Sequence, residues 1–218
     1  MSNIISCKNI IKSFSEDAPI IDDVSLELEE GCFASIMGRS GSGKTTLLRV
    51  ICGLEPLDAG EVTVAGFIVN KLNEKEKSHF RSKIIGIVFQ DSNLIDDFSV
   101  EENIFTPIYI AGEKPDLEYY KRLLEIAEIS HLKDRYPRTL SGGQRQRVAV
   151  IRALIAKPKV LFADEPTGSL DSKSEQQIMH LFSTVNKEFG ISILQVTHSE
   201  ECAGVGSRII RINDGKIE

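Results

Sequence analysis

The sequence has no excess of basic residues and no long hydrophobic run. Its 26 Lys and Arg side chains are outnumbered by 32 Asp and Glu side chains, which gives a formal net charge of -6. A broad nucleic-acid surface would need a basic stripe, so this charge balance argues against one. No apolar stretch approaches the ~18–20 residues that a membrane-spanning helix requires, so we expect no such helix.

Cysteine is scarce and shows no pattern. Cys7, Cys32, Cys52 and Cys202 are scattered and include no Cys-x-x-Cys spacing. We therefore expect reduced, buried thiols of a cytosolic protein. Residues 1–5 lack the basic flank and long apolar core of a signal peptide, so we expect no secretory signal there.

The sequence does contain an alternation of short apolar runs and amphipathic segments. Its 218 residues, 41% hydrophobic and 27% charged, fit one domain of ordinary composition. Apolar patterning predicts strands at residues 4–11, 24–28, 32–37, 61–64, 67–69, 84–89, 159–165, 191–197 and 208–212. Helices are expected at residues 47–52, 72–81, 117–129 and 172–188, and behind capping-box spacings at 99–102 and 141–144. Strands alternating with helices predict an α/β fold around a mostly parallel sheet. Residues 91–157 contain amphipathic and capping-box patterns of helices instead of strand-like apolar runs. They are therefore predicted to form a helical subdomain inserted between strands.

A glycine-rich turn lies between the strand expected at 32–37 and the helix expected at 47–52. It reads Gly38-Arg39-Ser40-Gly41-Ser42-Gly43-Lys44-Thr45-Thr46. A strand, a glycine-rich turn and a helix are the context that a P-loop requires. The glycines let backbone N–H groups converge on a phosphate at the positive end of the helix. All the fixed positions match, which disfavours an ordinary Gly/Ser loop. The expected ATP-binding residues are Gly38, Ser40, Gly41, Ser42, Gly43, Lys44, Thr45 and Thr46, with Lys44 on the β- and γ-phosphates and the Thr45 hydroxyl on Mg²⁺.

Two adjacent carboxylates end the strand expected at 159–165. Ligands bind at the carboxyl ends of strands in open parallel sheets, and adjacent side chains of an extended segment point to opposite sides. We therefore expect Asp164 to face Mg²⁺, directly or through water, and Glu165 to orient or deprotonate the water that attacks the γ-phosphate. The alternative is a plain acidic turn, and the P-loop makes that alternative the weaker one.

A second phosphate-binding pattern opens the helix behind residue 141. Ser141-Gly142-Gly143-Gln144 follows Leu140, and a serine with two glycines at a helix N-terminus forms another anion nest. A plain capped helix would explain Ser141 and Gln144 but not the pair of glycines. A chain with one P-loop has no evident need of a second phosphate site.

These motifs, with Gln90, the Ser-Leu-Asp of residues 169–171 and His198, occur in the order and approximate spacing of the ATP-binding subunits of ABC transporters. The sequence resembles that family over nearly its whole length. The resemblance implies one domain with a P-loop NTPase (RecA-like) core, an N-terminal antiparallel β subdomain and an inserted α-helical subdomain. Residues 1–90 and 158–218 would form the core and β subdomain, and residues 91–157 the helical subdomain that carries the signature motif. ATP and Mg²⁺ are the implied ligands.

The resemblance also implies roles for single residues. Gln90 would sense Mg²⁺ and the attacking water, and His198 would contact the γ-phosphate. The implied catalytic set is therefore Glu165, His198 and Gln90, and the implied metal set is Thr45, Gln90 and Asp164. Asp171 would contact the nucleotide site from the loop that follows.

Phe14 falls where the family places an aromatic residue that stacks on adenine. Core packing at a strand end explains the same residue equally well.

Two partners are implied by the resemblance, and neither is a nucleic acid. In the family two subunits meet head to tail, so Ser141, Gly142, Gly143 and Gln144 would close over ATP on the P-loop of a second copy. A separate transmembrane permease would hold the chain at the cytoplasmic face of the cell membrane.

The segment 91–110 is our candidate for docking the permease, because Leu94, Ile95, Phe98 and Ile108 lie there among polar residues. Each of these four residues is as well explained as core of the helical subdomain.

Residues 80–90 and 163–171 look most like the branch of the family that serves lipoprotein release, macrolide export and antimicrobial-peptide resistance. Members of that branch often have Asn where this chain has Ser169. The alternative is an ABC ATPase that acts as an ATP-gated switch in a non-transport complex. The DNA-repair type needs a long coiled coil and the translation type two ATPase halves, and this sequence shows neither. Glu165 and His198 argue against a scaffold protein that binds ATP without hydrolysing it. No residue in the sequence identifies the transported cargo.

Overall fold

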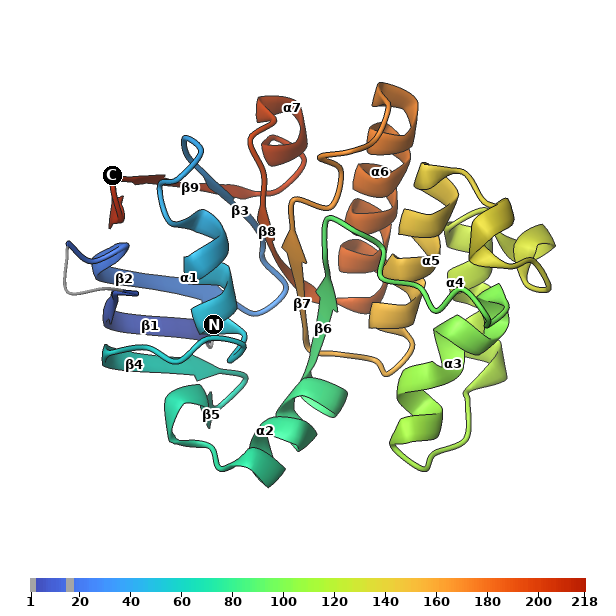
Figure 1. Cartoon of the computed structure of the whole chain (residues 1–218), viewed down its shortest axis with the longest axis horizontal. Coiled ribbons are helices and arrows are strands. Elements are labelled where there is room, and N and C mark those ends of the chain that lie inside the picture. The colour runs from blue at the N-terminus through green and yellow to red at the C-terminus, as the bar shows by residue number, and fades with distance from the viewer. Residues whose placement is uncertain (1–2, 15–17) are drawn as a thin grey trace.

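The computed structural model describes residues 3–14 and 18–218 and contains two β-sheets with helices packed around them (Figure 1). The strands are β1 (Asn3–Lys12), β2 (Ile21–Glu29), β3 (Phe33–Met37), β4 (Ala59–Val64), β5 (Phe67–Ile68), β6 (Ile85–Val88), β7 (Val160–Asp164), β8 (Ser192–Val196), β9 (Arg208–Asn213) and β10 (Lys216–Ile217). The helices are α1 (Lys44–Ile51), α2 (Glu74–His79), α3 (Val100–Ile110), α4 (Leu117–Ile126), α5 (Gly142–Leu154), α6 (Ser172–Phe189) and α7 (Glu200–Ala203). Short 3₁₀ turns lie at Val69–Lys71, Ser130–Leu132 and Pro137–Thr139, and one π-helical turn lies at Phe80–Ile84.

The smaller sheet is antiparallel, with the strand order β2-β1-β4-β5. Along the second half of β2 buried Val24, Leu26 and Leu28 alternate with exposed polar residues, so the sheet buries one face against the core. The β4–β5 hairpin turns through Ala65 and Gly66, which both have positive φ angles, as a tight hairpin turn requires. The expected β subdomain and its hairpin are confirmed.

The larger sheet has the order β10-β9-β3-β8-β7-β6, in which all neighbours are parallel except the terminal pair β9 and β10. Its central strands β3, β7 and β8 are buried throughout. Leu161 packs among the helices on one face, whereas Phe162 packs on the other face with α1 and the smaller sheet. Cover on both faces explains the near-continuous apolar runs. The predicted α/β fold is confirmed.

The chain forms α3, α4 and α5 between β6 and β7, and these helices share one core with Leu161 (Figure 1, right). Two of the helices begin with the predicted capping boxes. The Ser99 hydroxyl accepts from the Glu102 N–H at 3.3 Å, and the Ser141 hydroxyl accepts from the Gln144 N–H at 3.2 Å. Helix α4 ends three residues earlier than expected, because the chain turns through Glu128 at a φ of 55°.

Two further features of the fold differ from the sequence-based expectation. The helix expected at 72–81 is capped by Asn73 but ends at His79, and the chain continues through the π-helical turn that buries Phe80 beside Phe67. Helix α7 was not expected, since four residues are too few to show a helical period. Within residues 3–14 and 18–218, no helix combines the length and the apolarity that crossing a bilayer would take.

Candidate nucleotide site

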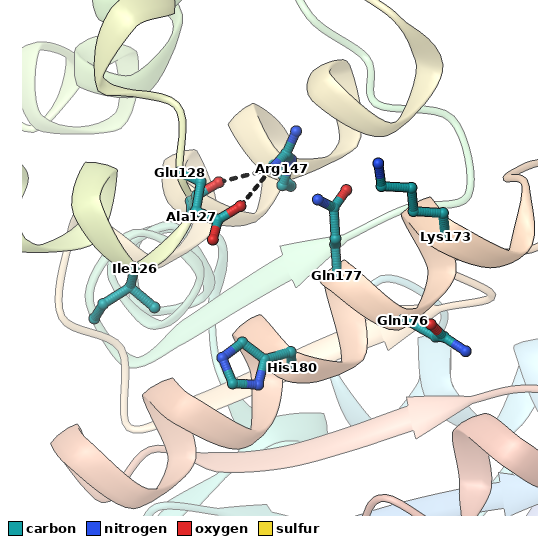
Figure 2. Close-up of a pocket in the computed structure, with 8 residues that line it drawn as sticks. All are labelled: Ile126, Ala127, Glu128, Arg147, Lys173, Gln176, Gln177 and His180. Carbon is teal, nitrogen blue, oxygen red and sulfur yellow. Dashed lines mark hydrogen bonds and ion pairs between the residues drawn. The ribbon is translucent and has the colours of Figure 1, made fainter.

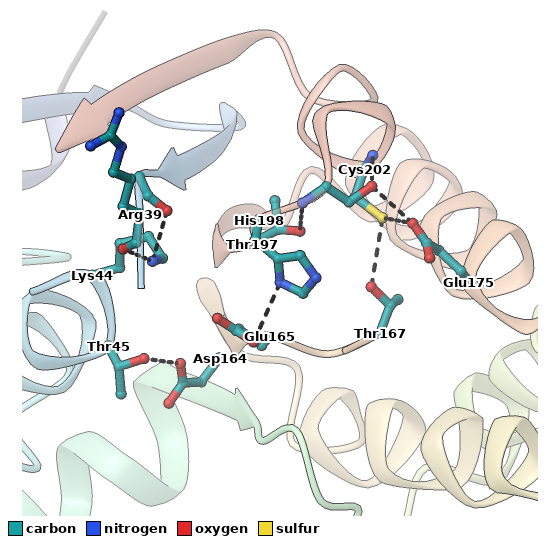
Figure 3. A network of polar contacts seen from close by, with 12 residues as sticks. Arg39, Lys44, Thr45, Asp164, Glu165, Thr167, Glu175, Thr197, His198 and Cys202 are labelled. Atoms are coloured by element: carbon teal, nitrogen blue, oxygen red, sulfur yellow. Dashed lines mark hydrogen bonds and ion pairs between the residues drawn. The ribbon is translucent and has the colours of Figure 1, made fainter. Parts of the chain in front are cut away.

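The glycine-rich turn joins β3 to α1 at the carboxyl edge of the larger sheet (Figure 3). Lys44 is only 5% exposed, and its Nζ donates to the carbonyl oxygens of Gly38 and Arg39 at 2.9 and 2.7 Å. The ammonium group therefore closes the loop on itself and lies at its centre. Gly43 has a φ of 97°, and a Cβ there would lie 2.8 Å from a backbone oxygen of Ile20, so only glycine fits.

The start of α1 is arranged for an anion. The helix has no capping side chain and no acidic residue in its first turn, so its first N–H groups and the positive end of its dipole are left for a ligand. The buried Ser42 Oγ has no hydrogen-bond partner among the residues that the structure describes. An orphaned buried hydroxyl beside a helix N-terminus fits a site whose last partner is a bound phosphate.

Thr45 and Asp164 bring the P-loop and β7 together. The Thr45 hydroxyl donates to Asp164 Oδ1 at 2.8 Å, and Arg49 Nη2 lies 3.7 Å from Asp164 Oδ2. A hydroxyl and a carboxylate side by side are oxygen ligands of the kind that Mg²⁺ takes from proteins, so Thr45 and Asp164 are the residues that would hold the ion. No group of three or more His, Cys, Asp and Glu side chains suited to a metal occurs in the described ranges. Sequence reasoning missed Arg49, because its partner Asp164 lies far away in the chain and no local spacing marks the pair.

Glu165 is oriented toward the site by a backbone conformation that the sequence did not predict. The expected extended conformation is wrong for Glu165, which has a φ of 46°, although its side chain does point away from that of Asp164, toward His198 instead of Thr45. Its N–H donates to the Val196 carbonyl at 3.0 Å, so the chain turns over the end of β8. That turn aims the carboxylate at His198, whose Nδ1 lies 3.5 Å from Glu165 Oε2 (Figure 3). A non-glycine residue held in the left-handed region stores backbone strain of the kind found at functional sites.

Gln90 belongs to the same cluster. A Cβ built on Gly168 would lie 3.3 Å from both Gln90 Nε2 and Glu165 Oε2, so both side chains border this glycine. The carboxyl ends of β6, β7 and β8 thus bring Gln90, Glu165 and His198 to one edge, where open parallel sheets bind ligands.

The segment from Ser141 to Gln144 lies elsewhere. Gly143 packs so closely on α6 that a Cβ there would overlap Ser174, and Gly142 faces Leu170. Helix α5 stands well apart from α1 (Figure 1). Ser141 is exposed, and Gly142 helps to line a cavity of about 240 Å³ together with Gln90 and Arg145. Within one chain, therefore, this second anion nest does not meet the P-loop.

Two other predicted site residues are placed at the surface. Phe14 is 60% exposed just beyond β1, with Lys12 Nζ 4.9 Å from its ring centroid. The exposed ring is not a core residue, so the packing alternative is wrong. Asp171 caps α6 by accepting from the N–H and hydroxyl of Ser174, and these hydrogen bonds lower the pKa of its carboxyl.

The candidate docking segment divides into exposed and buried residues. Ile95 and Phe98 are 41% and 39% exposed. Ile108 is buried and Leu94 packs against the same core, so the expectation of docking is wrong for Ile108.

A further cavity of about 240 Å³ lies between α4, α5 and α6 (Figure 2). Arg147 reaches toward it and donates to the Ala127 carbonyl, while Gln177 and His180 face it from α6. The cavity contains none of the residues expected at the nucleotide site.

Comparison with known proteins agrees with this geometry. The family model described as ABC transporter matches residues 21–168. The bacitracin export ATP-binding protein BceA of Halalkalibacterium halodurans is 40% identical over 98% of this chain and 87% of its own length. The lipoprotein-releasing system ATP-binding protein LolD of Bacteroides fragilis is 42% identical over 98% of this chain and 100% of its own length. The dimeric, post-hydrolysis structure of the ATP-binding cassette MJ0796 bound to ADP and Pi superposes with a TM-score of 0.87 at 38% identity, over 98% of this chain and 96% of that one.

The chain belongs to the ABC transporter family and is an ATPase of that family, which confirms the P-loop NTPase fold and the ATP ligand expected from the sequence. Within the family, the relatives place it in the branch of bacitracin export and lipoprotein release, so the expected branch is confirmed as well.

Proposed function

We propose that the cluster at the carboxyl edge of the larger sheet hydrolyses ATP with Lys44, Thr45, Asp164, Glu165, Gln90 and His198 in distinct roles. The proposal rests chiefly on one observation, the convergence of the P-loop with the ends of β6, β7 and β8. Lys44 exchanges its two carbonyl acceptors for the β- and γ-phosphates, a shift within the reach of its flexible side chain.

The remaining residues act on the metal and the water. Thr45 and Asp164 hold Mg²⁺, which neutralises charge on the phosphate oxygens when it is bound. Glu165 orients the attacking water and takes its proton on Oε2, the atom that faces His198. His198 steadies Glu165 and contacts the γ-phosphate, and Gln90 lies beside the same water. Phe14 stacks on adenine with its exposed ring.

The nucleotide site is completed by a second copy of the chain. Ser141 is exposed and Gly142 and Gly143 open α5, yet none of them reaches the P-loop of its own chain. In a head-to-tail pair, residues 141–144 of one copy close over ATP on the P-loop of the other, with Asp171 nearby. The closed pair excludes water and adds preorganised N–H donors at the phosphate. The similar MJ0796 cassette is dimeric, which supports the pairing of two copies.

Closure of the pair drives a separate transmembrane permease that holds the chain at the cytoplasmic face of the membrane. Residues 91–110 make the contact, through Ile95 and Phe98, which are exposed. The names of the relatives support an export or extrusion role, with peptides, lipoproteins or drugs as cargo. Import and non-transport roles have no comparable support.

Glu165→Gln tests the catalytic part. The amide keeps the size of the side chain but cannot take a proton, so hydrolysis should fall by at least about 100-fold while ATP affinity stays. The variant should form a dimer with ATP and Mg²⁺, measured by light scattering on a sizing column, and remain monomeric with ADP. Tight ATP binding without dimer at high protein concentration would contradict the head-to-tail arrangement.

An affinity pull-down of Glu165→Gln from gently solubilised native membranes, with ATP and Mg²⁺, tests the permease. Mass spectrometry should find a stoichiometric polytopic membrane protein. Recovery of only soluble partners would overturn the transporter role. Reversing the charges of Asp96 and Asp97 should weaken the capture, and unchanged capture would exclude this loop as the docking surface.

A further inference from the structure

The carboxylate of Glu175, in the first turn of α6, joins two side chains of the segment that follows His198. Its Oε1 accepts from the Ser199 hydroxyl at 3.0 Å and from the Cys202 thiol at 2.7 Å. Figure 3 shows the contact between Glu175 and Cys202. Ser199 caps α7 by accepting from the Cys202 N–H at 3.2 Å. One oxygen atom on α6 therefore fixes the whole first turn of α7.

The same network reaches the loop that follows Glu165. A thiol has one hydrogen, and Cys202 donates it to Glu175. The Thr167 hydroxyl, 3.6 Å from the sulfur, must then be the donor in that contact. Burial, with the hydrogen bond to Glu175, raises the pKa of the Cys202 thiol to about 11, so the thiol keeps its proton at neutral pH. Thr167 is itself buried and lies two residues after Glu165.

The backbone of Glu165 is tied to the end of β8 by its hydrogen bond to the Val196 carbonyl, but no comparable contact holds the side chains of Glu165 and His198 together within the described residues. The His198 side chain is 65% exposed, and its Nδ1 lies 3.5 Å from Glu165 Oε2. Glu165 occupies the left-handed region, which its surroundings must enforce. The backbones on either side therefore set the distance between the two side chains. Thr167 and Ser199 stand next to those backbones, and Glu175 and Cys202 connect them.

We propose that Glu175 is a positioning residue for ATP hydrolysis. Through its contacts with Ser199 and Cys202, and through the contact of Cys202 with Thr167, it holds the loops of Glu165 and His198 at the distance that catalysis needs. It also connects both loops to the start of α6, which directly follows Asp171. The proposal rests on the roles given above to Glu165 and His198. Glu175 itself touches neither nucleotide nor water in this role.

The position of Glu175 allows its side chain to be removed without unfolding the protein, so an effect on catalysis can be measured apart from an effect on stability. The side chain borders a cavity of about 270 Å³ that it shares with Met179, Cys202 and Val205, and Glu175 is itself half-buried. Water can therefore reach the hydroxyl and thiol that Glu175→Ala would leave without an acceptor. The fold should survive the change, while the restraint on the two loops is lost.

The test compares Glu175→Ala with Glu175→Gln in steady-state ATP hydrolysis. Because misplacement of catalytic groups by about 1 Å costs up to 100-fold, Glu175→Ala should lower kcat at least about tenfold. The KM for ATP and the affinity for a fluorescent ATP analogue should change less than about twofold, because the P-loop contacts are untouched. Glu175→Gln retains an oxygen that accepts from Ser199 and Cys202, so its kcat should stay within about threefold of the parent.

Glu188→Ala is the matched control on the same helix. Glu188 accepts two hydrogen bonds from Arg122 of α4 at 2.7 and 2.8 Å, away from the nucleotide site. Its loss should lower the melting temperature without changing kcat. A Glu175→Ala variant that behaves like this control, with kcat intact, would overturn the proposal, and so would a Glu175→Gln variant as slow as Glu175→Ala.

Cys202 supplies a second route if Glu175→Ala fails to fold. Cys202→Ala breaks the link between Thr167 and Glu175 and should lower kcat, whereas Cys202→Ser keeps a donor and acceptor and should restore it. Equal rates for these two variants would also refute the role. If Glu165 and His198 did not have the roles proposed for them, Glu165→Gln and His198→Ala would keep the parent's rate of ATP hydrolysis. That result would be distinct from a failure of the role proposed for Glu175 alone.

Discussion

Asn103 organises the loop that we propose for docking the permease, so its replacement should loosen that loop and lower the stability of the protein. Asn103 lies in α3 and is 1% exposed. Its Oδ1 accepts from the Ile95 N–H at 2.8 Å, and its Nδ2 lies 3.0 Å from the carbonyl oxygens of Ile95, Phe98 and Ser99. One side chain thus serves the Ile95 N–H and three carbonyl groups of this loop, of which those of Ile95 and Ser99 also accept from the backbone N–H groups of Phe98 and Asn103.

The magnitude follows from the number of hydrogen bonds. The amide has two hydrogens, so its three carbonyl contacts count as two donated bonds, and the bond to Ile95 N–H adds a third. At about 0.5–1.5 kcal/mol each, Asn103→Ala should lower the free energy of unfolding by about 3 kcal/mol. For a domain of this size that corresponds to a melting temperature lower by roughly 6–12 °C.

The assay is thermal unfolding of Asn103→Ala beside Asn103→Asp and Thr106→Ala. The aspartate has the same shape and keeps the acceptor, but it presents an oxygen to three carbonyl oxygens, so it should destabilise the protein at least as much as alanine. Thr106, on the same helix, donates from an exposed position to the Glu102 carbonyl, and its loss should cost less than about 0.5 kcal/mol. An Asn103→Asp protein as stable as the parent, or an Asn103→Ala protein no weaker than Thr106→Ala, would refute this reasoning.

Three further predictions concern packing, titration and nucleotide affinity. Gly86→Ala should cost about 1–3 kcal/mol in chemical unfolding, because the new Cβ would overlap the Ala153 carbonyl where β6 meets α5. Burial raises the pKa of the Cys7 and Cys52 thiols from 9.0 to about 12, so an aromatic disulfide reagent at pH 8 should modify neither until denaturant is added. Because the unfolded chain ionises these thiols first, the free energy of unfolding should fall as pH rises from about 9 toward 12, and less so when both are alanine. Phe14→Ala should raise the KM for ATP about tenfold with kcat little changed, since a stacked base contributes about 1–3 kcal/mol.

The elements that could be predicted from the sequence are those whose signal is local. The run at 32–37, the glycine-rich turn and the helix behind it carry their own geometry, and Ser99 and Ser141 cap helices through residues three positions away. The two buried faces of the larger sheet appear in the sequence as continuous apolar runs. Local backbone chemistry was enough for these features.

The features that escaped prediction depend on residues far apart in the chain. Glu165 adopts its left-handed conformation because its N–H bonds to Val196, 31 positions later. Ser199 and Cys202 meet Glu175 across 24 and 27 positions, and no pattern in the sequence marks that contact. The position of residues 141–144, away from the P-loop, likewise follows from packing on Ser174 rather than from the motif itself.

The measurement that tests the central proposal most directly is a mixing experiment between two inactive variants. Lys44→Ala removes the ammonium group from the P-loop, and Ser141→Arg blocks the second anion nest in the other variant. If each site is built from the P-loop of one copy and residues 141–144 of another, a mixed pair contains one fully intact site. An equal mixture should then recover up to about a quarter of the parent's ATPase rate, because half of the pairs are mixed and each has one working site of two. A mixture as inactive as its components, although sizing with ATP shows mixed pairs, would contradict the head-to-tail site.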